Sequence, residues 1–159
     1  MDYYDTIAGG YDELHKEEQL RKLSILKDEI KIGRDTKLLD VGCGTGISSG
    51  FDCMVIGLDP SSELLKQNRN GLAVLGMAEE IPFKNNSFDY VVSVTAIHNF
   101  NDIAKAMREI KRVGKKDFVF SVLSKSGKFS QIKKIIESNF RIAKIVAEQK
   151  DTIFFCTKP

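Results

Sequence analysis

Hydrophobic positions along the chain change their spacing several times, and each spacing predicts one kind of element. In residues 12–32, the side chains of Leu20, Leu23, Leu26 and Ile30 recur on one face of a helix, and Gly33 follows as a stop signal. Short, almost continuous apolar runs predict strands at residues 37–41, 53–59, 72–75, 88–96 and 117–123. Helical spacing returns at residues 61–71, 101–114 and 127–140. After the first helix, strands and helices therefore alternate.

The last two apolar runs follow each other directly. Residues 141–149 and 151–157 are separated by little more than Lys150, which favours a terminal antiparallel hairpin. The preceding alternation predicts an α/β fold with a Rossmann-like, doubly wound and mostly parallel sheet, and with helices on both faces. No repeat, low-complexity tract or linker interrupts residues 1–159, so a single domain is expected, with residues 1–33 as an N-terminal helix or lid.

Three glycines stand at alternate positions directly after the first predicted strand. In "KLLDVGCGTG", Gly42, Gly44 and Gly46 expose bare backbone at the carboxyl end of a strand, where doubly wound sheets bind their ligands. The spacing is not the G-x-G-x-x-G of dinucleotide sites, because Ile47 occupies the place of the third glycine. No Gly-Lys-Ser/Thr of a phosphate loop follows either. The pattern therefore argues against an NAD-dependent oxidoreductase.

Two carboxylates and one loop indicate what the glycines contact. Asp40 precedes the glycines, where it would repel a pyrophosphate but attract an amino group or a sulfonium. Asp59 ends the second strand and can accept both hydroxyls of a ribose. The loop at residues 76–87 follows the third strand, and its backbone and apolar side chains could hold an adenine. A cation, a ribose and an adenine together describe S-adenosylmethionine.

Five stretches carry a resemblance to a known family. They are "YDELH" (11–15), "LLDVGCGTG" (38–46), "VIGLDPS" (55–61), "AEEIPFKNNSFDYVVS" (78–93) and "AMREIKRV" (106–113). Their order and spacing are similar to those of class I S-adenosylmethionine-dependent methyltransferases, particularly the subgroup akin to the ubiquinone and menaquinone biosynthesis enzymes. The resemblance implies a methyltransferase with S-adenosylmethionine as cofactor, and a seven-stranded sheet whose last strand is antiparallel.

The resemblance also implies a set of cofactor-binding residues. Asp40 and the glycines would surround the methionine part, and Asp59 would take the ribose hydroxyls. Ala78 and Glu79 would lie beside the adenine, Tyr11 would close the site from the first helix, and Thr95 would border the space shared with the acceptor. The complete implied set is Tyr11, Asp40, Gly42, Cys43, Gly44, Gly46, Asp59, Pro60, Met77, Ala78, Glu79 and Thr95.

Two departures from the family pattern change these expectations. Only twelve residues separate Gly46 from Asp59, so the helix after the glycines has room for barely two turns. One flank of the sheet would then lack cover, and we expect the N-terminal helix or a second subunit, as in a homodimer, to shield it. Met77 stands where relatives often place an aspartate that bonds the adenine amino group. Adenine affinity would then depend on backbone contacts and packing.

The chemistry of transfer points to one histidine. His98 follows the fourth strand, and its ordinary pKa suits a general base or an acceptor contact, although a structural histidine that caps a loop fits equally. The expected activity is methyl transfer to an unidentified acceptor, most simply a small molecule. Two alternatives stay open: a non-catalytic S-adenosylmethionine-binding subunit, or an RNA or protein methyltransferase that works with a partner.

Charge and cysteine content limit the partners. Residues 1–104 carry 10 Lys and Arg against 17 Asp and Glu, whereas residues 105–150 carry 13 against 4. The basic part could bind RNA or an acidic protein, or could simply form solvated lysine-rich helices.

The 3 cysteines are scattered and odd in number, which argues against disulfides and a structural metal and favours a cytoplasmic protein. No apolar run is as long as a membrane span, so no membrane contact is expected.

Overall fold

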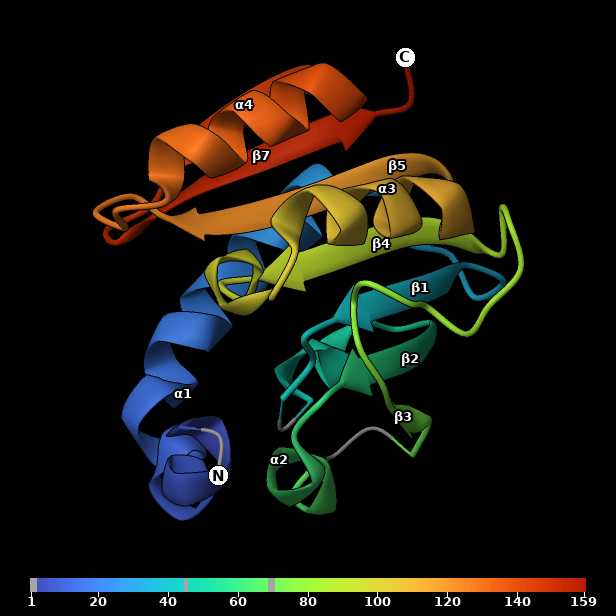
Figure 1. Cartoon of the computed structure of the whole chain (residues 1–159). Helices are drawn as coiled ribbons and strands as arrows, with labels where there is room; N and C mark the ends of the chain where they lie inside the picture. Colours follow the sequence, from blue (N-terminus) through green and yellow to red (C-terminus); the bar gives the residue numbers. More distant parts are fainter. Residues whose placement is uncertain (1–2, 45, 69–70) are drawn as a thin grey trace.

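The computed structural model describes residues 3–44, 46–68 and 71–159, and the side chains of these residues except 3–15, 47 and 49. In chain order the elements are α1 (Tyr3–Glu29), β1 (Lys37–Val41), η1 (Ile47–Gly50), β2 (Met54–Asp59), α2 (Ser62–Lys66), β3 (Ala73–Leu75), β4 (Phe88–Val94), η2 (Ile97–Asn99), α3 (Ile103–Val113), β5 (Gly114–Leu123), α4 (Phe129–Asn139), β6 (Arg141–Ala147) and β7 (Asp151–Thr157). Figure 1 shows that they form a sheet with helices packed against it.

The described strands form one seven-stranded sheet in the order β3–β2–β1–β4–β5–β7–β6. Strands β1 to β5 are parallel, and β7 is antiparallel to both of its neighbours, so its arrowhead points opposite to that of β5 in Figure 1. The predicted fold class and terminal hairpin are confirmed. Because β1 lies between β2 and β4, the strand order reverses there, and the carboxyl end of β1 opens onto the crevice where such sheets bind ligands.

One face of the sheet is covered by α3 and α4. The predicted apolar stripe of α3 is buried: Ile103, Met107, Ile110 and Val113 are at most 6% exposed. This stripe joins Phe118 and Phe120 of β5, together with α4 residues, in the larger hydrophobic cluster. Burial of this stripe holds α3 lengthwise along the sheet (Figure 1). Because α3 begins after the carboxyl end of β4, the segment before α3 borders the crevice.

The opposite face is covered by α1. Leu23 and Leu26 pack with Val92, Val119 and Ile153 in the second hydrophobic cluster. The helix after the glycines is the single four-residue 3-10 turn η1, which confirms that this segment is short. The N-terminal helix therefore supplies the expected cover from within the same chain. The second helix is shorter than predicted, because the N–H groups of Gln67 and Asn68 bond to carbonyls three residues back and end α2 in tight turns.

Helix α1 is also joined to the strands by a buried polar group of four residues, Lys22, Thr95, Ser121 and Asp151, which we call the carboxyl-edge cluster. Lys22 and Asp151 are 0% exposed. The Lys22 Nζ lies 2.8 Å from Thr95 Oγ1 and 3.2 Å from Asp151 Oδ2. The hydroxyls of Thr95 and Ser121 donate to the same Asp151 oxygen, at 2.6 and 2.5 Å. The cluster holds α1 over the ends of β4 and β5.

No helix of the described residues has both the length and the apolar composition that crossing a bilayer requires.

Candidate functional site

The three glycines after β1 all adopt backbone angles that favour glycine. Gly42, Gly44 and Gly46 have φ values of +79°, +54° and +85°. A Cβ atom on Gly42 would also lie 2.5 Å from the Cβ of Ala96, which is too close for any side chain. The N–H of Gly42 donates to the carbonyl of Leu58 at 2.7 Å, so the turn begins in contact with β2. The structure thus explains why side chains are missing here.

Asp40 presents a buried carboxyl group directly before this turn. The residue is 4% exposed, its Oδ2 accepts a 2.5 Å hydrogen bond from Ser48 Oγ, and its Oδ1 has no protein partner. Burial raises the pKa of Asp40 to about 7; the hydrogen bond from Ser48 opposes this rise, and the charge of Asp59 adds to it. A buried carboxyl oxygen without a partner fits a cationic ligand group. Ser48 was missed by the sequence reasoning, because nothing in "GISSG" distinguishes it from Ser49.

Asp59 joins the end of β2 to the glycine turn. It is 6% exposed; its Oδ1 accepts the N–H of Ser61 at 2.8 Å, and its Oδ2 accepts the N–H of Gly44 at 2.9 Å. A carboxylate has about four acceptor positions, so one that supports the backbone can also accept hydrogen bonds from ligand hydroxyls. Asp59 is therefore both a structural support of the turn and a candidate ribose contact.

A cavity of about 220 Å³ lies beside these residues. Its lining consists of Val41, Gly42, Leu58, Pro60, Gly76, Met77, Ala78, Glu79, Asn99, Phe100 and Asn101. Gly42, Pro60, Met77, Ala78 and Glu79 were predicted as cofactor contacts, and the structure brings them together. The volume is below the ~300 Å³ at which pockets for whole small ligands begin, so it suits one ring system of a larger ligand. The segment 99–101 was missed, because only the tertiary fold brings it to this cavity.

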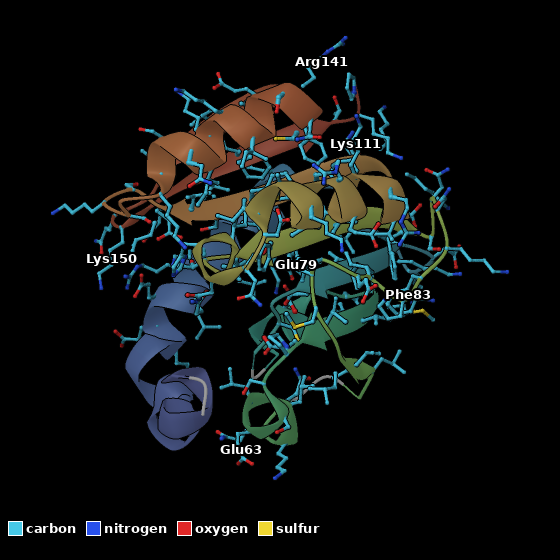
Figure 2. The ribbon with its side chains drawn as sticks, in the orientation of Figure 1. Glu63, Glu79, Phe83, Lys111, Arg141 and Lys150 are labelled. Carbon is cyan, nitrogen blue, oxygen red and sulfur yellow. The ribbon has the colours of Figure 1, made fainter. Side chains whose placement is uncertain are left out.

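The loop that contributes Met77 to Glu79 is held in place by α3. The Arg112 guanidinium donates to the carbonyls of Ile81 and Phe83 at 2.9 and 2.8 Å, and Glu109 accepts the Ile81 N–H at 3.0 Å. The Glu79 carboxylate accepts the N–H of Asp102 at 3.0 Å, at the start of α3 (Figure 2). These hydrogen bonds hold this wall of the cavity against α3.

Two of the remaining predicted residues, Thr95 and His98, follow the carboxyl end of β4. Thr95 has a φ of +51°, and its hydroxyl is engaged in the carboxyl-edge cluster. His98 lies half-buried in η2, and Lys128 Nζ donates to its carbonyl at 3.0 Å. Burial lowers the pKa of His98; Lys128 and Lys22 act in the same direction and Asp151 opposes them. The imidazole is thus neutral near pH 7 and able to accept a proton. The side chain of Tyr11 lies outside the described residues.

Cys43 contributes packing to the turn rather than a reactive thiol. It is buried, and burial raises the pKa of its thiol far above the ordinary value. Its side chain fills the space beside Gly57, where a Cβ would lie 2.6 Å from Cys43 Sγ. Among the side chains that the structure describes, no group of three or more His, Cys, Asp or Glu residues could hold a metal ion.

Comparison with known sequences gives a family match over the centre of the chain. A family model described as a methyltransferase domain matches residues 39–122. An uncharacterized protein of Methanocaldococcus jannaschii is 37% identical over 160 aligned residues, which cover 96% of this chain and 63% of that protein. A demethylmenaquinone methyltransferase of Corynebacterium kroppenstedtii is 33% identical over 116 residues, 69% of this chain and 48% of the enzyme. The chain thus spans about half to two thirds of the length of these relatives.

Solved structures share the fold over most of the chain. A chain from the complex between the Haloferax volcanii Trm112 methyltransferase activator and a candidate methyltransferase matches with a TM-score of 0.84 and 15% identity, covering 100% of this chain and 99% of that one. An S-adenosylmethionine-dependent methyltransferase of Aquifex aeolicus matches with a TM-score of 0.73 and 17% identity, covering 86% and 89%. At these identities the likeness concerns the fold alone.

Proposed function

The chain belongs to the class I S-adenosylmethionine-dependent methyltransferase family, and from this premise we propose that it transfers a methyl group from S-adenosylmethionine to a small-molecule acceptor. The observation that carries the proposal is the buried Asp40 carboxyl, whose Oδ1 has no protein partner beside the left-handed glycine turn. A carboxylate in this position attracts the ammonium group at the amino-acid end of the cofactor.

Three groups of residues support the way in which the cofactor binds. Asp40 and the glycine turn would hold the amino-acid end, and Asp59 would accept hydrogen bonds from the ribose hydroxyls. The 220 Å³ cavity, lined by Met77, Ala78 and other residues, would take the adenine. Because Met77 has no strong acceptor, adenine recognition would rest on packing and on backbone groups.

When bound, the cofactor supplies a methyl group already activated on a sulfonium. The acceptor atom would gain the methyl group and lose a proton, and the electron pair of the C–S bond would stay on sulfur. The chain's part is then to align the acceptor and to take up that proton. We assign proton uptake to His98, because its lowered pKa keeps it neutral and because it follows β4 at the carboxyl edge.

Binding of the reaction product S-adenosylhomocysteine is expected to depend on pH through Asp40. Below a pKa of about 7 the carboxyl is protonated before the ligand arrives and must lose its proton to pair with the ammonium. Lowering the pH from 8 to 6 should therefore raise Kd about tenfold, and Asp40→Asn should remove this dependence. Titration calorimetry at pH 6 and pH 8 measures Kd for the unmodified chain and for Asp40→Asn. NAD serves as a control ligand, which we expect not to bind. Absence of binding by S-adenosylhomocysteine at every pH would contradict the proposed function itself.

Loss of the His98 imidazole is expected to slow transfer without weakening cofactor binding. Because the methyl group is already activated, we expect His98→Ala to reduce transfer by about tenfold to a hundredfold, at the low end of general-base effects. The measurement is incorporation of labelled methyl groups into a metabolite extract, beside the Kd for S-adenosylhomocysteine. Unchanged incorporation would show that His98 only supports the loop.

A second candidate is a subunit that works with an activating protein. Strand β3 pairs with β2 alone among the described strands, and Leu72 and Leu75 beside its open edge are 50% and 60% exposed. Apolar side chains on an edge strand favour the addition of a partner strand. Met77, 39% exposed, follows β3 and also lines the cavity. A partner bound at the edge of β3 would therefore lie beside the proposed adenine site. The Haloferax complex with an activator provides a model for such a partner. A second copy of this chain is the other partner that we propose for this edge. Methyl incorporation by the chain alone would decide against this candidate.

An anionic partner, RNA or an acidic protein, is also proposed for the basic region at residues 105–150. Burial lowers the pKa of Lys158, and the charge of Lys111, near the end of α3, adds to this effect. Figure 2 shows Lys111 and Arg141 on the side of the molecule where β7 ends, with Lys150 on the opposite side. Such a surface could dock a polyanion but lies away from the glycine turn, so it would not choose the methylated atom.

A further inference from the structure

A side chain outside every predicted motif, that of Asn68, contacts the glycine turn. It follows α2, and its Nδ2 donates to the carbonyl of Gly44 at 2.9 Å and lies 3.5 Å from Cys43 Sγ. A Cβ atom on Gly46 would lie 2.7–2.9 Å from three atoms of the Asn68 amide. The absence of a side chain at Gly46 therefore leaves the space that Asn68 fills.

Both backbone groups of Gly44, its N–H and its carbonyl, therefore form hydrogen bonds with side chains. Its N–H donates to Asp59 Oδ2 at 2.9 Å, and its carbonyl accepts from Asn68 Nδ2. These two bonds fix two successive peptide groups of a glycine, the residue type that loses most conformational freedom when it is ordered. Both partners belong to the segment 59–68, which thus holds the turn before a ligand arrives.

The segment after the turn gives little support of its own. Gly46 precedes η1 with no side-chain hydrogen bond to cap it, and η1 is only four residues long. A 3-10 turn of this length has weaker hydrogen-bond geometry than an α-helix. Support of the turn must then come from other elements, and Asn68, in the turn after α2, adds its side chain to the support from Asp59.

We propose that Asn68 is a positioning residue, which orients the glycine turn for the amino-acid end of S-adenosylmethionine. This inference rests on the proposed function, because it takes the turn as the contact of that end. It also predicts a selectivity between ligands. Loss of the Asn68 amide should weaken the binding of ligands that have the amino-acid end. It should not weaken the binding of 5′-methylthioadenosine, which keeps the adenine and ribose but lacks that end. A purely structural role would weaken both kinds of ligand together.

The test compares two ligands in three variants by titration calorimetry. With Asn68→Ala, Kd for S-adenosylhomocysteine should rise about tenfold, the effect of losing roughly one hydrogen bond, while Kd for 5′-methylthioadenosine stays within about twofold. Asn68→Leu keeps a side chain of similar size against Gly46 but removes the donor, and should behave like Asn68→Ala. Gln67→Ala, an exposed neighbour, is the matched control and should change neither Kd.

Each outcome decides the matter. Equal weakening of both ligands, or no change in either with Asn68→Ala and Asn68→Leu, would overturn the role of Asn68. Failure of the unmodified chain to bind S-adenosylhomocysteine would instead overturn the proposed function. Thermal unfolding of each variant checks that the fold is retained; if Asn68→Ala does not fold, Asn68→Leu carries the comparison.

Discussion

Asp59→Ala is expected to weaken the binding of S-adenosylhomocysteine by at least about 100-fold, because two hydrogen bonds from ribose hydroxyls to a charged acceptor contribute about 1.5–3 kcal/mol each. The change also frees the backbone N–H groups of Gly44 and Ser61, which the carboxylate accepts at 2.9 and 2.8 Å. The turn should then lose order before the ligand binds, which adds to the loss. Titration calorimetry gives Kd directly.

The control for this variant is Glu63→Ala on α2, only a few residues further along the chain. Glu63 forms an exposed ion pair with Lys66 at 2.8 Å, so its removal should change Kd by less than about twofold. Asp59→Asn keeps one acceptor oxygen but turns an NH₂ group toward a backbone donor, and should lose nearly as much affinity as Asp59→Ala. An affinity in Asp59→Ala equal to that of the unmodified chain would show that the ribose lies elsewhere.

Lys22→Ala is expected to lower the free energy of unfolding by about 3–5 kcal/mol, because it leaves the Asp151 carboxylate buried without its counter-charge. Lys22 and Asp151 are both 0% exposed and 3.2 Å apart, and Asp151 Oδ1 already lacks a partner. In a chain of this size the loss corresponds to a fall in Tm of about 6–20 °C. Urea unfolding followed by circular dichroism measures the free energy.

An exposed ion pair between the same helix and β6 is the matched control for Lys22. Lys144 Nζ lies 2.7 Å from Glu29 Oε1, with 54% of the Lys144 side chain exposed, so Lys144→Ala should lower the free energy of unfolding by at most about 1 kcal/mol. The double variant Lys22→Met with Asp151→Asn removes both charges and should regain most of the lost stability. A loss in Lys22→Ala as small as that in Lys144→Ala would contradict the importance of the carboxyl-edge cluster.

The parts of the site that could be predicted from the sequence are those adjacent to a strand end. Asp40 and the glycines flank the end of β1, Asp59 ends β2, and Met77 follows β3. Parallel strands bring their carboxyl ends to one edge, so neighbouring residues in the motif become neighbours in space. Gly42, Pro60 and Met77, which follow three different strands, line the same cavity, as this rule predicts.

Other contacts could not be predicted, because they depend on where the helices end and how they pack. Asn68 reaches Gly44 because α2 stops at Lys66, whereas the sequence pattern favoured a helix to residue 71. Lys22 directly precedes Leu23 of the apolar stripe, a position from which lysine usually reaches water while its stem is buried. Only the folded chain shows that Asp151, at the start of β7, meets it instead.

The docking of α1 against strands formed much later in the chain has a consequence for biosynthesis. Leu23 and Leu26 leave the ribosome long before Ile153 and Phe155, which belong to the same hydrophobic cluster. Until β7 has been made, the apolar side of the nascent helix therefore stays uncovered. Such exposed apolar surface binds chaperones and promotes aggregation. Translation arrested before β7 should leave this helix accessible to protease, and release of the finished hairpin should protect it.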